Sequence, residues 1–395
     1  MRINWHSNAP WSSTGYGNQT RVFAPRIKNL GYDIGITAFY GLQGGQANWN
    51  GIRVLPVGKH PYGQDIIGAA AEFDNANCII TLMDAWVVQA ENIRLPWFPW
   101  FPVDCEPMPK VVLDKVRQAT KGITMSRFGQ LQAEAAHLET FYIPHGVETD
   151  VFKPLSGSRE RLKWPLDKFI VGMVAANKGV PPRKSFYEQI TAFAALHHEK
   201  PDTLLYLHTD DGGRGGESVD LVEYCQKLGL RVAWMTNDPV NDETDVLFSD
   251  QYTYLLGLPD PYMVDAYNGM DVLMNVSMGE GFGIPIVEAQ ACGTPVIVGG
   301  WTSMDELVFS GWKIAKSEAR QSYHPYFKAW QWSASPEAIA DRLFKAYEMR
   351  GNADYRSRAR DGALRYDADK VTDKYWKPAL AEMAQMILPK LAVKP

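Results

Sequence analysis

An alternation of short apolar runs with helix-like segments constrains the fold of this chain more than any other feature of its sequence. The runs are rich in β-branched and aromatic residues, and each ends at a polar or glycine-containing loop, as buried strands do. Strands that alternate with helices form parallel sheets with helices on both faces, so the sequence predicts an α/β fold. The expected strands are RINWHS, YDIGITAFYG, NANCIITLMDAW, PWFPWFPVD, GITMS, ETFYIPHGV, FIVGMVAAN, TLLYLHTD, LRVAWMT, DVLMNVS and TPVIVGG.

A poorly periodic segment divides this alternation into two series. The stretch FKPLSGSRERLKWPLDK holds two prolines and several charges, and we expect a linker at residues 156–168. Domains of roughly 100–200 residues suggest two of them in this chain. We expect Rossmann-like domains at 1–155 and 169–371, and a C-terminal helix at 372–395, anchored by Trp376, that packs back toward the first domain. Two doubly wound domains in tandem would face a central cleft, with ligands beyond the carboxyl ends of the strands.

Composition and charge narrow the class of protein. The net charge of −5 gives no bulk attraction for a polyanion, although a local basic groove can exist within such a total. The four cysteines form no CxxC pair and no metal-ligand spacing, as expected of free thiols in a reducing compartment. The opening residues MRINWHSNAP lack the apolar core of a signal peptide, and no run approaches the ~18 apolar residues of a transmembrane helix. We therefore expect a cytoplasmic protein without a transmembrane segment.

The stretch SMGEGFGIPIVEAQACGTPVIVGG, residues 277–300, predicts a ligand site at the start of a helix. The strand DVLMNVS leads into a glycine-rich loop whose backbone amides can approach a ligand closely. Pro285 suits the first position of the helix, and Gly293 suits its C-terminal cap. The unpaired amides and partial positive charge of such a helix start bind phosphate groups.

Two glutamates in this stretch indicate what else the ligand carries. Glu280 lies in the loop, and Glu288 lies in the first turn of the expected helix, where its side chain leans back toward the ligand side. Either glutamate alone is explained by solvent exposure, but their coincidence with the glycines and Pro285 favours a site. Two carboxylates facing a phosphate would repel it, so they are better suited to accept hydrogen bonds from hydroxyls. A diphosphate between two polyhydroxyl groups, as in a nucleotide sugar, meets both requirements.

A basic loop follows the first strand of the second series. NKGVPPRKSF concentrates Lys178, Arg183 and Lys184 at the carboxyl end of that strand. Such a group can clamp a leaving diphosphate, although a solvated basic loop has the same composition.

The corresponding loop of the first series is NAPWSSTGYGNQ, between the first strand and the first helix. Gly15 and Gly17, separated by Tyr16, can expose amides at that helix start, or can serve a purely structural turn. The pattern is not G-x-G-x-x-G, so we do not expect a nicotinamide cofactor.

Acidic and histidine residues offer weaker candidates. Asp84 and Asp104 end apparent strands of the first series, and either can orient or deprotonate an acceptor hydroxyl. Helix capping and turn formation are commoner roles for such residues. We expect His6 and His145 to be packed rather than catalytic.

Two further segments are expected to be structural. HTDDGG, residues 208–213, lacks the D-x-D spacing of a metal site and is typical of a turn. The aromatic segment YHPYFKAWQWS can stack on a sugar or a base, but we expect it to pack on the domain surface.

These segments together resemble a known family. GEGFGIPIVEAQACGTPVI is similar to the E-x7-E signature of retaining glycosyltransferases with the GT-B fold, a family 4-like or group 1 family that includes sucrose synthases and bacterial mannosyl- and glucosyltransferases. The resemblance covers roughly residues 1–310 and is strong over 120–310. It is carried also by TMSRFGQ, YIPHGVETDVFKP, VGMVAANKGVPPRKSF and AYNGMDVLMNVS. It implies the GT-B fold, and a nucleotide-diphosphate sugar as co-substrate with no other cofactor and no metal.

The resemblance also implies roles for individual residues. Glu280 would contact the transferred sugar, and Glu288 the ribose hydroxyls. The family has an arginine near the position of Lys178, and a lysine offers a point charge instead of a planar fork. The implied donor-binding residues are Gly15, Tyr16, Gly17, Lys178, Phe282, Gly283, Ile284 and Glu288, and those expected to be catalytic are Glu280, Lys184, Arg183 and Asp104.

The resulting hypothesis is a retaining, metal-independent glycosyltransferase. Its second domain would bind the donor, with UDP-glucose expected first and GDP-mannose second, and its first domain would hold the acceptor. One alternative is a DNA-modifying glycosyltransferase acting on hydroxymethylated bases, which would show salt-dependent duplex binding. Others are a non-catalytic nucleotide-sugar or glycan-binding module, which would not hydrolyse a donor, and an epimerase, which would need no acceptor. The sequence leaves the acceptor open among glycans, small molecules and modified DNA.

Overall fold

The structure, a computed structural model, describes residues 1–179, 181–213 and 218–391. The chain divides into two units. The first comprises Met1–Glu148, His324–Ala329 and Tyr366–Pro395, and the second comprises Thr149–Tyr323 and Trp330–Arg365. The linker expected at 156–168 groups with the second unit, and part of it forms the helix α5 (Ser158–Leu162).

The first unit is built on a sheet with the strand order β3-β4-β2-β1-β5-β6-β7-β8. Neighbouring strands are parallel except β3 and β4, which pair antiparallel at one edge. The strand order reverses at β1, which has β2 on one side and β5 on the other. The strands are β1 (Arg2–Asn8), β2 (Asp33–Tyr40), β3 (Ala47–Trp49), β4 (Ile52–Leu55), β5 (Cys78–Leu82), β6 (Trp97–Phe101), β7 (Gly122–Thr124) and β8 (Thr140–Tyr142).

An aromatic cluster forms part of the core of the first unit. Trp5 of β1 and Trp100 of β6 are fully buried, with ring centroids 6.0 Å apart. Trp376 lies 5.6 Å from Trp5 and 5.1 Å from Trp100, so it is the apolar anchor that the sequence predicts. The helices of this unit are α1 (Gly15–Asn29), α2 (Ile67–Phe73), η1 (Ala85–Val87), η2 (Ala90–Asn92), α3 (Lys110–Val116), α4 (Arg127–Ala135), α13 (Ala368–Val371), the π-helix η6 (Thr372–Trp376) and α14 (Lys377–Leu391). Residues 392–395 of the expected C-terminal helix lie outside the described residues.

The second unit is built on a parallel sheet with the strand order β11-β12-β10-β9-β13-β14-β15. The order reverses at β9, which has β10 on one side and β13 on the other. The strands are β9 (Phe169–Val174), β10 (Thr203–His208), β11 (Val232–Trp234), β12 (Val246–Phe248), β13 (Val272–Asn275), β14 (Val296–Gly299) and β15 (Gly311–Ile314), with the separate pair β16 (Ala319–His324) and β17 (Ala329–Ala334).

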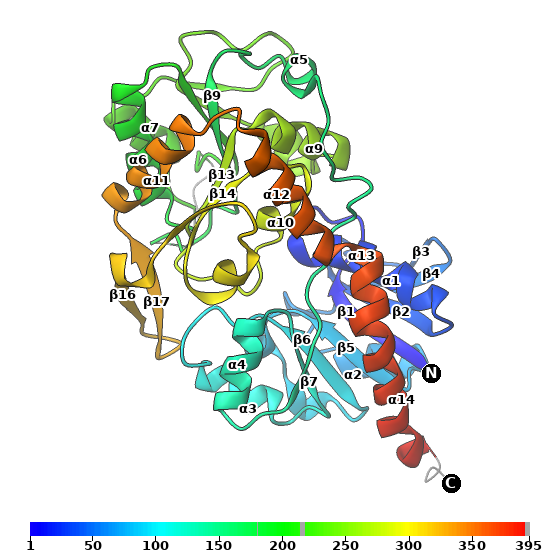
Figure 1. The fold of residues 1–395 in the computed structure, drawn as a ribbon. Helices are drawn as coiled ribbons and strands as arrows, with labels where there is room; N and C mark the ends of the chain where they lie inside the picture. The colour runs from blue at the N-terminus through cyan, green and yellow to red at the C-terminus, as the bar shows by residue number, and fades with distance from the viewer. Residues whose placement is uncertain (180, 214–217, 392–395) are drawn as a thin grey trace. The chain divides into compact units, whose positions relative to one another are not determined.

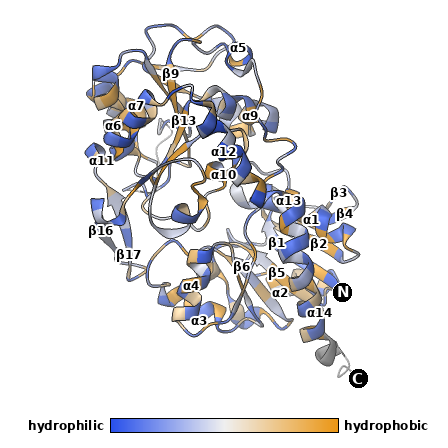
Figure 2. Cartoon of the chain, in the orientation of Figure 1, coloured by the Kyte–Doolittle hydropathy of each residue, from blue (hydrophilic) through white to orange (hydrophobic). Residues whose placement is uncertain are grey.

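Helices lie on both sides of the second sheet. Figure 1 shows α6 (Phe186–Glu199), α7 (Leu221–Lys227) and α11 (Pro336–Glu348) on one side of β9, β13 and β14, with α9 (Asp260–Gly269), α10 (Ile284–Ala291) and α12 (Ala353–Ala363) on the other. In Figure 2 the central strands β9 and β13 are mostly orange and helix α12 is mostly blue, as expected for strands buried on both faces. The remaining helical segments are α8 (Gln251–Leu256), η3 (Thr302–Leu307), η4 (Lys316–Glu318) and η5 (Leu364–Tyr366).

The strands expected from the apolar runs are confirmed in both sheets. The sequence did not predict β3, β4, β12, β15 or the β16–β17 pair. Among the described residues, no helix has the length and apolarity needed to cross a bilayer.

Candidate functional site

The glycine-rich loop after β13 leads directly into α10. Gly283, the residue before the helix, has a φ of +107°, and a Cβ there would lie 2.8 Å from Ile286 Cδ1. This turn therefore requires glycine. The helix begins at Ile284, so Pro285 is its second residue, whereas the sequence predicts it as the first. Gly293 (φ +83°) follows the C-terminal cap, as the sequence predicts. The first amides of α10 have no partner within the helix, so they present a partial positive charge at its start.

Glu280, in the same loop, is a buried carboxylate held by two cations. Its side chain is 7% exposed, and Lys184 Nζ lies 2.5 Å from its Oε1. Ser277 Oγ donates to the same Oε1 at 2.7 Å, and an Arg183 nitrogen lies 3.6 Å from Oε2 while also donating to the Gly279 carbonyl. Burial disfavours the charged form of Glu280, but the charges of Lys184 and Arg183 outweigh burial and lower its pKa to about 2.

Strand order brings Lys184 and Glu280 together. Lys184 follows β9, Glu280 follows β13, and these strands are parallel neighbours at the reversal point of the sheet. Their loops therefore leave the sheet side by side, where open α/β sheets bind ligands. Gln189 of α6, fully buried, fixes the two loops together because its Nε2 donates to the Lys184 carbonyl at 2.7 Å and its Oε1 accepts from the Val276 amide at 3.0 Å.

Glu288 is the fifth residue of α10 and is half-buried. Its predicted place in the first turn is wrong, because the helix begins at Ile284, one residue before Pro285. Its Oε2 accepts a hydrogen bond of 2.8 Å from the hydroxyl of Tyr267 in α9. Burial and the neighbouring carboxylate raise the pKa of Tyr267 well above 10, so this hydroxyl stays a donor at neutral pH. Phe282, by contrast, has a buried side chain, so only its backbone can serve a ligand, as predicted.

The sequence did not predict Ser277 or Tyr267, which orient the two glutamates. Ser277 lies three residues before Glu280 in the same loop, so the sequence spacing alone could have predicted a contact between the two side chains. Tyr267 lies 21 residues from Glu288, and only the packing of α9 beside α10 brings the two together.

Lys178 is the member of the basic loop that the structure does not bring to Glu280. Its side chain is exposed. The neighbouring Asn177 is buried instead, and its side chain bonds to the Val219 backbone and the Asp210 carbonyl. Val180, in the same loop, lies outside the described residues.

The glycine loop of the first unit forms a capped helix start. Gly15 is the first residue of α1, and the side chain of Thr14 caps the helix by accepting from the Gly17 amide at 3.0 Å. A Cβ on Gly17 would lie 2.2 Å from the Ser12 carbonyl oxygen, so glycine is needed there by the turn itself. The Gly17 amide is thus occupied within the fold, while Tyr16 belongs to the first turn.

The acidic and histidine candidates of the first unit lie at strand and helix ends or in the packed core. Asp104 follows β6 and accepts from Cys105 Sγ at 3.3 Å, and Asp84 precedes η1. His145 is buried against Trp100, with ring centroids 4.6 Å apart, and burial lowers its pKa to about 3. The sequence predicts a packed histidine at this position, and the burial of His145 agrees with that prediction.

The segment HTDDGG forms a turn after β10. Asp210 accepts from the Gly212 amide at 2.8 Å, and Asp211 accepts from the Gly213 amide at 2.9 Å. Over the described parts of the chain, no group of three or more His, Cys, Asp or Glu residues is placed to hold a metal ion.

The aromatic segment YHPYFKAWQWS divides between two environments. Trp332 of β17 is buried, with Lys316 Nζ 4.0 Å from its ring centroid. Trp330 is 40% exposed and lies 5.1 Å from Tyr323, ring centroid to ring centroid. The prediction of surface packing therefore holds for Trp332.

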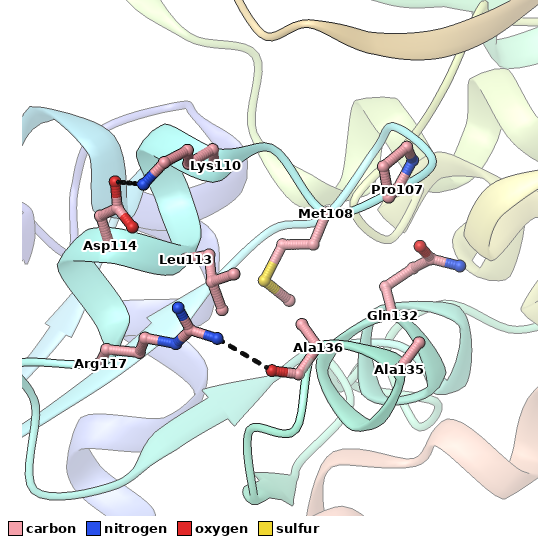
Figure 3. A pocket seen from close by; sticks show the side chains of 9 residues that line it. All are labelled: Pro107, Met108, Lys110, Leu113, Asp114, Arg117, Gln132, Ala135 and Ala136. Carbon is pink, nitrogen blue, oxygen red and sulfur yellow. Dashed lines mark hydrogen bonds and ion pairs between the residues drawn. The ribbon is translucent and has the colours of Figure 1, made fainter.

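A cavity of about 400 Å³ lies in the first unit, between α3 and α4. Figure 3 shows Met108 and Leu113 pointing into it, with Gln132 at one side and Arg117 donating to the Ala136 carbonyl across it. None of the residues that the sequence singled out lines this cavity.

Similarity to known proteins agrees with this geometry. Residues 158–312 match the family model described as glycosyl transferases group 1, a range that includes Lys184, Glu280 and Glu288. This part of the chain is a group 1 glycosyltransferase domain. D-inositol 3-phosphate glycosyltransferase of Segniliparus rotundus is 26% identical over 183 residues, which cover 43% of this chain and 36% of that relative. The chain thus matches well under two thirds of that relative's length.

Solved structures show that the whole chain has the GT-B fold. Sucrose-phosphate synthase from Thermosynechococcus elongatus aligns with a TM-score of 0.70 and 16% identity over 100% of both chains. HepE of Anabaena, determined in complex with UDP-glucose, aligns with a TM-score of 0.68 and 17% identity over 96% of this chain and 100% of HepE. The predicted architecture of two Rossmann-like domains is therefore confirmed.

Proposed function

We propose that the protein is a retaining glycosyltransferase that moves a sugar from a nucleotide-diphosphate sugar to an acceptor hydroxyl. One observation carries the proposal. The glycine-rich loop that leads into α10 contains a buried carboxylate, Glu280, and Lys184 from another loop forms an ion pair with it. A helix start and a lysine suit a diphosphate, and a carboxylate suits sugar hydroxyls.

The donor would be bound by groups of the second unit. Lys184, which lies 2.5 Å from Glu280, would place its positive charge beside the diphosphate oxygens. Glu288 would accept hydrogen bonds from the ribose hydroxyls. The hydrogen bond from Tyr267 would orient the Glu288 carboxylate for this role. Glu280 Oε1 is taken by Lys184 and Ser277, which leaves acceptor capacity on Oε2 for a sugar hydroxyl. Because HepE is bound to UDP-glucose in its structure, UDP-glucose is the first donor to test and GDP-mannose the second.

The chemical step would be a displacement without a protein nucleophile. The bond from the anomeric carbon to the diphosphate breaks, and the acceptor oxygen attacks the same face, so the configuration is retained. Lys184, Arg183, the Gly283 amide before α10 and the Ile284 amide at its start would stabilise the growing charge on the diphosphate. The acceptor proton passes to the departing phosphate oxygen or to a carboxylate of the first unit, for which Asp104 is the candidate.

The proposal is tested by donor turnover in a Lys184→Ala variant. Wild type should release nucleoside diphosphate from UDP-glucose or GDP-mannose, slowly with water and faster with an acceptor. Removing one well-placed charge stabiliser should lower this rate by about 10²–10³. Lys345→Ala, which removes an exposed lysine of α11, is the matched control and should keep the wild-type rate.

Two results would contradict the proposed function. A Lys184→Ala rate within about twofold of wild type, well short of the expected loss, would remove Lys184 from the mechanism. Saturable binding of both donors without release of nucleoside diphosphate would identify a non-catalytic binding module instead.

A further inference from the structure

The segment after β14 contacts the acidic loop through three consecutive side chains. Trp301, Thr302 and Ser303 are all buried, and each bonds to the main chain of residues 277–282. We call these three residues the clamp. They are 21 or more residues from Glu280 in sequence, and none of them is used in the proposed chemistry above.

The clamp bonds to both main-chain groups of Glu280. Thr302 Oγ1 accepts from the Glu280 amide at 3.1 Å, and Ser303 Oγ donates to the Glu280 carbonyl at 2.8 Å. Ser303 Oγ also lies 2.6 Å from the Phe282 carbonyl, so its single proton is shared between two acceptors. The Trp301 indole donates to the Ser277 carbonyl at 3.0 Å. The backbone is therefore fixed at Glu280 and on both sides of it.

The backbone at Thr302 is strained, and the Trp301 ring packs closely against Gly299. Thr302 has a φ of +51°, a left-handed conformation that a β-branched residue rarely adopts. A Cβ on Gly299 would lie 2.3 Å from the Trp301 ring, so the indole can fold over the loop only because residue 299 is glycine. Strained positions that persist in a well-packed region often mark a functional constraint.

We propose that Thr302 and Ser303 are positioning residues for Glu280, and this rests on the proposed function. Lys184 and Ser277 fix the carboxylate end of the side chain, while the two hydroxyls of the clamp fix the main chain from which it extends. The carboxylate is thus presented to the sugar without rearrangement, and a small displacement of such a group is costly to turnover.

The test compares Thr302→Val, Thr302→Ser and Ser303→Ala in the full chain. Valine keeps the shape of threonine without the acceptor, and serine keeps the hydroxyl without the methyl group. Turnover of UDP-glucose and GDP-mannose should fall by about 10–100-fold in Thr302→Val and Ser303→Ala. Thr302→Ser should stay near wild type, and the affinity for UDP or GDP alone should be unchanged, because these nucleotides lack the sugar that Glu280 would contact.

Ser335→Ala is the control for a merely structural effect. It removes the hydroxyl that caps α11 in the same unit, so it should lower the melting temperature without lowering turnover by the folded protein. Wild-type turnover in Thr302→Val, or equal loss in Thr302→Val and Thr302→Ser, would overturn the positioning role.

Hydrogen exchange at the Glu280 amide separates this inference from the proposed function. Its rate should rise about tenfold or more in Thr302→Val, through loss of the hydrogen-bond acceptor, and remain unchanged in Thr302→Ser. If the wild type turns over neither donor, the proposed function for these donors fails. Equal exchange rates of the Glu280 amide in wild type and Thr302→Val would overturn the role of the clamp. A faster exchange in Thr302→Val but not in Thr302→Ser would support that role even if neither donor is turned over.

Discussion

At the scale of single residues, the neighbours of a buried group decide whether it is charged at neutral pH. Glu280 stays ionised in a buried position because Lys184 and Arg183 outweigh the cost of burial, and its pKa falls to about 2. For His145, burial lowers the pKa to about 3. His6, whose ring nitrogen lies 2.9 Å from the Tyr62 carbonyl, likewise has its pKa lowered to about 4. Glu280 is therefore built to be charged, and the histidines are built to be neutral.

These shifts predict that stability falls as the pH drops below 6.5. An unfolded histidine binds a proton near pH 6.5, whereas folded His145 and His6 resist protonation until about pH 3 and 4, so acid favours unfolding. Each such histidine contributes a loss of about 1.4 kcal/mol per pH unit within its window. Glu280 adds a further loss between its ordinary value of 4.5 and about 2. Thermal melting from pH 7.5 to pH 4.5 measures the first effect.

His145→Leu isolates one histidine in this measurement. The variant should lose less stability than wild type as the pH falls, because the titrating ring is gone. His198→Leu, which replaces an exposed histidine of α6, is the control. An identical pH dependence in wild type and His145→Leu would contradict the account of His145 as a buried neutral group.

At the scale of elements, α10 depends on the glycine that precedes it. An alanine at position 283 would have to adopt a φ of +107° and would bring its Cβ within 2.8 Å of Ile286. We expect Gly283→Ala to destabilise the protein by about 1–3 kcal/mol and to displace the helix start, which lowers donor affinity as well. Gly44→Ala is the matched control, since no atom lies within 4 Å of a Cβ there. Thermal melting with and without nucleotide measures both effects, and equal behaviour of the two variants would refute the requirement for glycine.

Local sequence pattern predicted this element but not its partners. Pro285, Gly293 and the apolar runs fixed α10 and its flanking strands, because each acts through the conformation of its own segment. The contact of Lys184 with Glu280 crosses 96 residues and depends on β9 and β13 being neighbours, which no local pattern encodes. The clamp of Trp301, Thr302 and Ser303 was missed for the same reason. Gly17 was predicted as a ligand amide, whereas a capping bond to Thr14 occupies it in the fold.

At the scale of the whole molecule, the candidate site residues are divided between the two units. The second unit contains Glu280, Lys184 and Glu288, and residues 158–312 of this unit match the family model of group 1 glycosyltransferases. The first unit contains Asp104 and the capped loop at Gly15, and its core includes the C-terminal Trp376. The donor groups used in the proposed function all lie in the second unit, so the proposal for donor binding can be tested without knowledge of the acceptor.

The most direct test of the central claim is thermal stabilisation of the full chain by a panel of nucleotides and nucleotide sugars. Ligand that binds only the native state contributes about 2.7 kcal/mol at a hundredfold excess over Kd, which raises the melting temperature. We predict a selective rise with one nucleoside diphosphate and its sugar, lost in Glu288→Gln and retained in Glu348→Gln, an exposed control in α11. No rise with any nucleotide at millimolar concentration would contradict a nucleotide-sugar site at Glu280 and Glu288.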